Sequence, residues 1–312
     1  MKKSVVALNG GLGNQLFQWF FAHTLIENGP FVLDFLFEKE DPLRQRGFQL
    51  DGLVRNCEHV AKGEDGAIAK FKFGVVTHLF NHLWLIAFFR RPLTWLGYYR
   101  ENPIKSVAQS STVPNPVRYA YGYFQKQQII DGLNETVERE LLPVVQSLLP
   151  DLLKKHNLNF PYTAIHFRHY LTEGLKLTPV HFCNLSLQYF TEWNSTNSGQ
   201  QIVLLTDQVA DVADLIELLQ PKVVLDREQT TAWETLALMS GATRFLGANS
   251  SLSWWGARLS SAQGGEVWLP SDWSYWGNVN PKDFHFESCN TAKAYWDISG
   301  FQSPAQTPKN LQ

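Results

Sequence analysis

The sequence predicts an α/β protein of two domains, each built on a parallel sheet. From residue 160 onward, short β-rich apolar runs alternate with helical patterns, as in strands joined by right-handed helical crossovers. Near the N-terminus the same order occurs as a strand, a glycine-rich turn, a helix and a second strand. A chain of 312 residues is long enough for two domains of ordinary size.

The N-terminal domain is expected to span residues 1–155. Its first strand, 4–8, leads into a helix whose apolar side chains, from Leu16 to Phe21, recur at helical spacing. Asn28-Gly29-Pro30 ends this helix, and a second strand follows at 31–35. The remaining expectations are a loop at 36–66, apolar helix at 67–100, an irregular link at 101–116, a strand at 117–124 and a helix at 127–149.

The C-terminal domain is expected to span residues 156–312 and to end in a frayed tail of about 12 residues. Pro150 and the polar stretch that follows it mark the hinge. Strands are expected at 162–167, 201–206, 222–225, 243–246 and 266–269, with helices near 180–194, 209–219, 231–240 and 251–262. Ligands of such folds bind at the carboxyl ends of the strands, in the cleft between domains.

Composition excludes several classes of function. A formal net charge of −2 gives no electrostatic basis for binding duplex nucleic acid. The 3 cysteines form no C-x-x-C pair, which argues against a disulfide framework or a zinc site and fits a reducing compartment. No apolar run reaches the ~20 residues that span a bilayer. The apolar stretch 82–89 has basic neighbours, so a buried helix is favoured while membrane contact by residues 76–100 stays open.

The first candidate site is the stretch NGGLGNQLFQ, residues 9–18. A glycine-rich turn between a strand and a helix exposes backbone N–H groups that attract anions. Gly11 and Gly13 allow a ligand to approach the backbone, and Asn14 and Gln15 add amide donors or cap the turn. Leu16 replaces the third glycine of a dinucleotide fingerprint, and no G-K-[ST] follows, so both of those nucleotide motifs are disfavoured.

Two further candidate sites follow predicted strands. His166 and Arg168 alternate on one side of the chain after the strand at 162–167, where an arginine suits a diphosphate or forms a surface salt bridge. Asp207 closes the strand at 201–206, and its carboxylate can accept from the N–H groups of a guanine edge or cap the next helix.

The fourth candidate site is the segment that starts the helix at 251–262. Asn249, Ser250 and Ser251 place polar groups at its N-terminus, which is either a second anion site or a well-capped helix. His78 and His82 lie four residues apart in apolar surroundings with no third ligand, so no metal site is predicted.

Taken together, GGLGNQLFQ, HFR, LLTD, ANSSLSWWGARLS and LPSDW resemble the motifs of the bacterial α-1,2-fucosyltransferase family, in that family's order. The resemblance spans most of the chain except about residues 36–115. It implies a GT-B architecture, with two Rossmann-like domains facing each other across a cleft. It also implies an inverting transfer from GDP-L-fucose to a β-galactoside with no required metal, the first domain serving mainly the acceptor and the second the donor.

The resemblance also assigns roles to individual residues. Arg168 matches the arginine that grips the β-phosphate, and His166 matches the histidine that helps seat the nucleoside. Asp207 would read guanine, and Asn14 would face the reacting centre. The residues expected to bind the donor are Gly11, Gly13, Asn14, Gln15, His166, Arg168, Asp207, Asn249, Ser250 and Ser251.

The sequence departs from the family where His-x-Arg-Arg is usual, followed by an acid two places later. His169, Tyr170 and Leu171 follow Arg168 instead. The expected catalytic residues are Asn14 and Arg168, with His169 and Glu173 as alternative general bases.

Other functions stay open from the sequence. The chain could be a transferase for another nucleotide sugar or a non-catalytic glycan-binding protein built on its C-terminal tryptophans. The expected partners are GDP-L-fucose and a β-galactoside glycan, with no nucleic acid. Bacterial relatives lead us to expect a cytoplasmic protein at the inner membrane face, and the sequence leaves a homodimer open.

Overall fold

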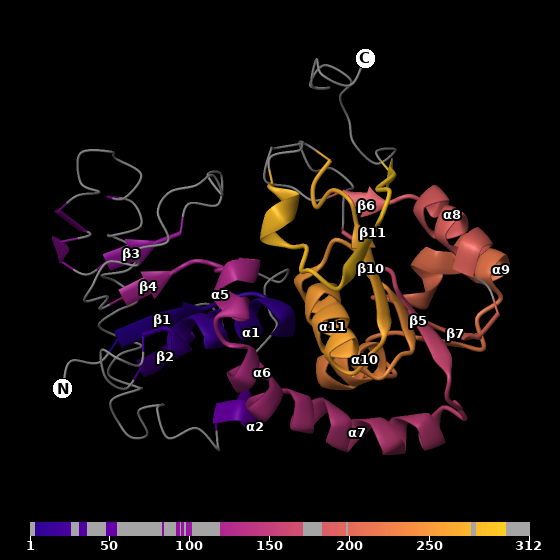
Figure 1. Cartoon of the computed structure of the whole chain (residues 1–312), viewed down its shortest axis with the longest axis horizontal. Coiled ribbons are helices and arrows are strands. Elements are labelled where there is room, and N and C mark those ends of the chain that lie inside the picture. Colours follow the sequence, from indigo (N-terminus) through magenta and orange to yellow (C-terminus); the bar gives the residue numbers. More distant parts are fainter. Residues whose placement is uncertain are drawn as a thin grey trace, which may run out of the picture. The chain divides into compact units, whose positions relative to one another are not determined.

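The computed structural model describes residues 4–25, 31–35, 48–54, 83, 92–93, 95–96, 98–101, 119–170, 183–197, 199–275 and 279–297 (Figure 1). The chain forms two compact units, residues 1–141 and 142–312. The division lies before the expected boundary at residue 155, because helix α7 (Leu142–Lys155) packs against α10 (Ala232–Ser240) in the second unit. The α/β class with two units is confirmed, and the roles expected for the two domains stay predictions.

The first unit contains a four-stranded parallel sheet in the order β2-β1-β4-β3. The expected strands are present as β1 (Ser4–Leu8), β2 (Phe31–Phe35) and β4 (Tyr119–Tyr121). The fourth strand, β3 (Tyr98–Arg100), lies where the apolar run predicted helix, and that prediction is wrong for these residues. Tyr98 stacks on Tyr119 of the neighbouring strand at 5.7 Å, a cross-strand aromatic pair that favours the extended form.

Helix α1 (Leu12–His23) follows β1 after a tight turn and is almost wholly buried. Gly10 has φ +77°, and a Cβ at this position would lie 2.3 Å from Nδ2 of Asn14. Gly10 is therefore required by the turn itself. A short helix, α2 (Asp51–Val54), lies later in this unit.

Gln18 of α1 is completely buried and ties the sheet to the helix. Its Oε1 accepts from the Asn9 N–H at 3.0 Å, while its Nε2 donates to Asn9 Oδ1 at 3.1 Å and to the Gly122 carbonyl at 2.9 Å. The Gln18 side chain thus joins the ends of β1 and β4.

The single helix expected at 127–149 is three helices: α5 (Gln127–Asp131), α6 (Asn134–Glu140) and α7. Pro150, expected at a hinge, lies inside α7. Proline removes one helical hydrogen bond, but Val145 and Leu152 are buried on either side of it. The hinge prediction at Pro150 is therefore wrong, since tertiary packing carries the helix past the proline.

The second unit contains a six-stranded parallel sheet in the order β11-β10-β9-β5-β7-β8. The five expected strands are present as β5 (Tyr162–His166), β7 (Gln201–Leu205), β8 (Val223–Leu225), β9 (Arg244–Leu246) and β10 (Glu266–Pro270). An unexpected edge strand, β11 (Cys289–Ala292), and an antiparallel pair, β6 (Asn184–Leu185) with β12 (Trp296–Asp297), complete the described strands. Their polar sequences carry little strand signal.

The helices expected at 209–219, 231–240 and 251–262 are present. The helix expected near 180–194 is wrong for residues 184–185, which pair with β12 as β6, and the helix begins at Leu187. Six described helical segments follow α7 in the second unit. They are α8 (Leu187–Asn197), the 3₁₀ turn η2 (Val209–Val212), α9 (Ala213–Leu219), α10, α11 (Ser251–Ala262) and the 3₁₀ turn η3 (Pro281–Asp283). Helix α10 begins with a capping box between Thr231 and Glu234. Gly256 of α11 faces Met239 of α10, where an added Cβ would lie 2.7 Å from the Met239 Cβ.

Among the described residues, no helix has the length and apolar character needed to cross a membrane.

We expect Gln18→Ala to lower the free energy of unfolding of the first unit by about 2 to 4 kcal/mol, because it leaves buried backbone and amide groups unpaired. Gln128→Ala, at an exposed position of α5, is the matched control and should cost less than about 0.5 kcal/mol. Urea denaturation of both variants measures the difference. Equal stability of the two variants would contradict the role of the Gln18 contacts.

Candidate functional site

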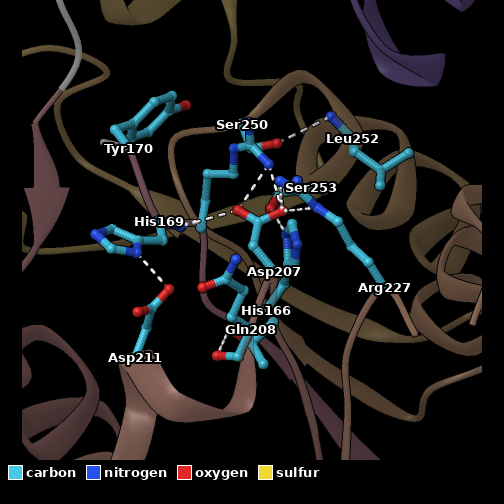
Figure 2. Close-up of polar contacts among 12 residues, drawn as sticks. His166, His169, Tyr170, Asp207, Gln208, Asp211, Arg227, Ser250, Leu252 and Ser253 are labelled. Carbon is cyan, nitrogen blue, oxygen red and sulfur yellow. Dashed lines mark hydrogen bonds and ion pairs between the residues drawn. The ribbon is translucent and has the colours of Figure 1, made fainter. Parts of the chain in front are cut away.

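The carboxyl ends of β5, β7, β8 and β9 bring polar side chains from four distant segments together (Figure 2). These segments follow the strands directly, at residues 167–170, 206–211, 226–227 and 247–253. The strands are parallel and adjacent, so their ends meet at one edge of the sheet. The second unit therefore has a polar cluster where a ligand site is expected in such folds.

Asp207 lies at the centre of the cluster, with its side chain 11 % exposed. Its carboxylate accepts from Nη1 of Arg168 at 2.5 and 2.7 Å, and from the backbone N–H of His169 at 3.1 Å. Arg227 donates to the same carboxylate through Nε, at 2.8 Å, and through Nη2. The contacts occupy both oxygens of Asp207 and give it the role of an anchor for two arginines.

The charges around Asp207 keep it ionised. Burial acts to raise the pKa of this carboxyl, but the Arg168 and Arg227 guanidiniums, with a smaller contribution from His166, lower it below its ordinary value. Within this trio, two fixed positive charges of Arg168 and Arg227 face the single negative charge of Asp207.

Arg227 is a member of the cluster that the sequence reasoning missed. It comes two residues after β8, and its side chain is 53 % exposed. A charged residue just beyond the end of a parallel strand was the signal that singled out Arg168, and the same signal was available for Arg227.

His169 and Asp211 form a second pair beside Asp207. Nδ1 of His169 contacts Oδ2 of Asp211, which lies in η2. Figure 2 shows this pair and Arg227 on opposite sides of Asp207. Asp211 was missed by the sequence reasoning, although it lies four residues after Asp207.

His166 ends β5 and points toward α11. Its Nδ1 lies 2.5 Å from Oγ of Ser253, and this Oγ also accepts from the Ala248 N–H at 3.0 Å. His166 is 4 % exposed. Its visible contact therefore connects the sheet to the start of α11, and the role in seating a nucleoside stays a prediction.

The polar residues at the start of α11 are engaged in the fold. Ser250 caps the helix by accepting from the Leu252 N–H at 3.2 Å. Asn249 is buried, and its Nδ2 donates to the Cys183 carbonyl at 3.1 Å. Ser251 is the first residue of the helix and is half-buried. The segment is a well-capped helix start. A capped start still carries the partial positive charge that attracts anions, so an anion site here stays a prediction.

Tyr170 supports Arg168 from its ring face. The Arg168 guanidinium carbon lies 5.3 Å from the centre of the Tyr170 ring. The Tyr170 hydroxyl donates to the Asn249 carbonyl at 2.7 Å, and its backbone N–H donates to Oδ1 of Asn184 at 2.7 Å. Tyr170, noted in the sequence only as a departure from a motif, thus links β6 to the segment that precedes α11.

The glycine-turn residues form a separate group in the first unit. Gly11 is the N-cap of α1, and Gly13 lies in its first turn. Oδ1 of Asn14 accepts from Nε2 of Gln125 at 2.7 Å. Gln15 is buried, donates to the Gly10 carbonyl at 2.9 Å and accepts from the Gln49 N–H at 3.0 Å. Gln15 thus connects the turn at Gly10 to the backbone at Gln49. Donor binding by these four residues stays a prediction.

Some expected residues lie outside the described part of the chain. Glu173, His78 and His82 are among them, as are most of residues 76–100 and the C-terminal tail. Within the described ranges, no three His, Cys, Asp or Glu side chains gather as a metal site would require. Cys183 and Cys289 are free thiols, and burial raises their pKa values to about 11 and about 12.

No protein-family model and no curated protein matches the chain. Solved structures with a similar fold include a family 9 glycosyl transferase from Veillonella parvula, at 13 % identity and TM-score 0.44, covering 94 % of this chain and 85 % of that one. The fucosyltransferase NodZ from Bradyrhizobium matches at 12 % identity and TM-score 0.44, and the match covers 83 % of this chain and 92 % of NodZ. POFUT1 in complex with GDP matches at 14 % identity and TM-score 0.42, and the match covers 85 % of this chain and 96 % of POFUT1. Likeness at this level carries no argument about function, which has to come from the residues themselves.

We expect Asp207→Asn to destabilise the second unit by about 2 to 3 kcal/mol at pH 7, because two guanidiniums lose a buried anionic partner. The pKa of Asp207 is lowered in the folded chain, so its stabilisation is present above the unfolded value of about 4 and is lost as pH falls below it. The gap between wild type and variant should therefore shrink as pH falls below about 4, as a pH series of urea denaturation would measure.

The control is Asp214→Asn, which changes an exposed carboxyl of α9. A gap that stays constant with pH for Asp207→Asn would contradict the ionised state of this carboxyl.

Proposed function

We propose that the chain is an inverting glycosyltransferase of GT-B architecture that transfers L-fucose from GDP-β-L-fucose to the 2-hydroxyl of a β-galactoside. The observation that carries the proposal is the anchoring of Arg168 and Arg227 on one buried carboxylate, at the carboxyl edge of a parallel sheet. A diphosphate leaving group needs fixed positive charge there, because negative charge builds on it as the glycosidic bond breaks.

Arg168 is arranged to donate to such a group. Its contacts to Asp207 use only Nη1, so the remaining donors of its planar fork are available for a phosphate oxygen. The Tyr170 ring and the Asp207 carboxylate hold the guanidinium from two directions. A preorganised guanidinium costs little conformational entropy when the ligand binds.

Arg227 supplies the second positive charge. Its half-exposed side chain lies on the same carboxylate, so a diphosphate that approaches Arg168 also meets Arg227. We propose that it takes the place of the second arginine that the family motif has and this sequence lacks after Arg168. The N-terminus of α11, capped by Ser250, adds its partial charge.

The choice of fucose, guanine and the galactose 2-hydroxyl comes from the motif resemblance. Asp207 was expected to read guanine, but its contacts favour the anchoring role. In our proposal His166, Asn249, Ser250 and Ser251 line the donor site. Gly11, Gly13, Asn14 and Gln15 are kept as expected donor-binding residues from the motif resemblance.

The reaction replaces one bond at the sugar's anomeric carbon with another on the opposite face. The galactose oxygen forms the new bond as the bond to the β-phosphate oxygen breaks, and GDP leaves with the electron pair. The β-linked donor thereby gives an α-1,2 product in one step. Arg168 and Arg227 stabilise the charge on the departing phosphate.

The direct test is transfer of labelled fucose from GDP-fucose to a panel of β-galactosides in EDTA, with the linkage determined by NMR. An α-1,2 product supports the donor, the linkage and metal independence together. Transfer from another nucleotide sugar would replace fucose while keeping the reaction class. Glycan binding without GDP binding would favour a non-catalytic glycan-binding protein.

We expect Arg168→Ala to lower kcat/KM for transfer at least 100-fold, equivalent to about 2.7 kcal/mol of lost transition-state stabilisation. The matched control is Arg244→Ala, because Arg244 opens β9 and pairs with Glu266 at 3.2 Å, at the opposite edge of the sheet. Circular dichroism should show both variants folded. Activity of Arg168→Ala within threefold of wild type would contradict its role.

Arg227→Ala should weaken GDP binding about tenfold, as isothermal titration calorimetry would measure, since it removes one charge-assisted contact. Affinity for guanosine, which lacks phosphates, should change less than twofold. An equal loss for both ligands would instead indicate collapse of the Asp207 cluster.

A further inference from the structure

We propose that Asp211 positions His169 as the general base that takes the proton of the acceptor hydroxyl. This inference rests on the proposed transfer reaction and deepens it. It names which of two candidate bases acts, and it assigns a role to an aspartate that neither the motifs nor the resemblance singled out.

His169 is held at two points. Its backbone N–H donates to Asp207 at 3.1 Å, which fixes the start of the side chain beside the arginine pair. Its ring contacts Asp211 through Nδ1, which fixes the rotation of the imidazole. An imidazole constrained at both ends loses little freedom when a substrate binds.

The contact to Asp211 also selects the tautomer. A carboxylate accepts hydrogen bonds, so in the neutral ring Nδ1 carries the hydrogen and Nε2 carries the free lone pair. Figure 2 shows the ring edge that does not face Asp211 directed away from Asp207. The side chain of His169 is 26 % exposed, so it is partly open to solvent. The proposal places the substrate hydroxyl at Nε2.

Three other titratable side chains described at this edge, Asp207, His166 and Asp226, are engaged in contacts within the protein. The Asp207 carboxylate carries two arginines and a backbone N–H. His166 is buried against Ser253. Asp226 accepts from the N–H groups of Val209, at 3.3 Å, and Glu228, at 3.0 Å. His169, paired with Asp211, is the best-placed base among them.

Nε2 of His169 takes the proton of the acceptor hydroxyl. At the same time the oxygen of that hydroxyl forms a bond to the anomeric carbon of fucose. The bond from that carbon to the β-phosphate oxygen breaks, and its electron pair leaves with GDP. Asp211 stabilises the resulting imidazolium, which then releases its proton to solvent. Asp211 is thus a positioning residue, and His169 is the catalytic one.

The kinetic test compares His169→Gln, Asp211→Asn and the control Asp214→Asn, an exposed carboxyl on the next helix. We expect kcat to fall 100-fold or more for His169→Gln and about tenfold for Asp211→Asn, because a positioned base contributes ~10²–10⁴-fold. The KM for GDP-fucose and the Kd for GDP should stay within threefold of wild type in both. Wild-type kcat in His169→Gln, or a greater loss in Asp211→Asn than in His169→Gln, would overturn the assignment.

A second measurement needs no substrate. Histidine-labelled ¹⁵N NMR of the unliganded chain at neutral to alkaline pH should show His169 as the Nδ1–H tautomer in the wild type and in Asp214→Asn. Asp211→Asn should lose that preference. A wild-type His169 in the Nε2–H form would overturn the pair.

The failures can be told apart. If the wild-type chain neither binds GDP nor transfers a sugar, the proposed function fails and the base role with it. If the wild-type chain transfers fucose while Asp211→Asn keeps full kcat and the same tautomer, only the inference about Asp211 fails.

Discussion

The candidate site depends on one buried carboxylate. Removing Asp207 from water is unfavourable unless positive groups surround it, and Arg168 and Arg227 do so from two different strand ends. The same contacts fix the arginines, which would otherwise sample many rotamers at the protein surface. A single aspartate thereby holds two long side chains in fixed positions, and it also accepts from the His169 N–H just beyond β5.

The parallel topology determines which residues can join this cluster. Strands β8, β7, β5 and β9 are neighbours in the sheet, although their sequence order is different. Each crossover returns the chain to the same edge, so residues far apart in the sequence contribute to one site. Asp207 and Arg227 are 20 residues apart, and Arg168 and Asn249 are 81 apart. Helix α11 closes the group, since its Ser253 meets His166 at the end of β5. The residues of the candidate site therefore lie on the strand ends that the sheet topology brings together.

Several residues of the cluster could be predicted from the sequence, because a regular α/β pattern shows where each strand ends. Arg168, His166 and Asp207 were found for that reason. Their partners were not, since pairing depends on how far each side chain reaches across the sheet edge. Arg227 and Asp211 follow strands that were placed correctly, yet nothing in the local sequence says which carboxylate or ring they meet.

The misplaced elements have a similar cause. Tyr98 forms a strand through a stacking partner that lies 21 residues away, and Pro150 stays helical through packing on both sides. Local propensity carries no information about such partners. The contacts of Gln15, to the backbone of Gly10 in its own turn and of Gln49 much later in the chain, likewise could not be predicted from the motif, and its binding of a ligand stays a prediction.

The two buried glutamines of α1 change what the glycine-rich stretch can report about relatives of this chain. Gln15 and Gln18 hold the turn and the sheet in place, so a protein that had lost all catalytic ability would still need them to fold. A related chain that keeps GNQ-x-x-Q therefore shows that it keeps this fold, and the motif says nothing about catalysis. Under the proposed mechanism, chains that kept this stretch but had lost His169 or Asp211 would be candidates for inactive homologues, which the glycine-rich motif alone does not identify.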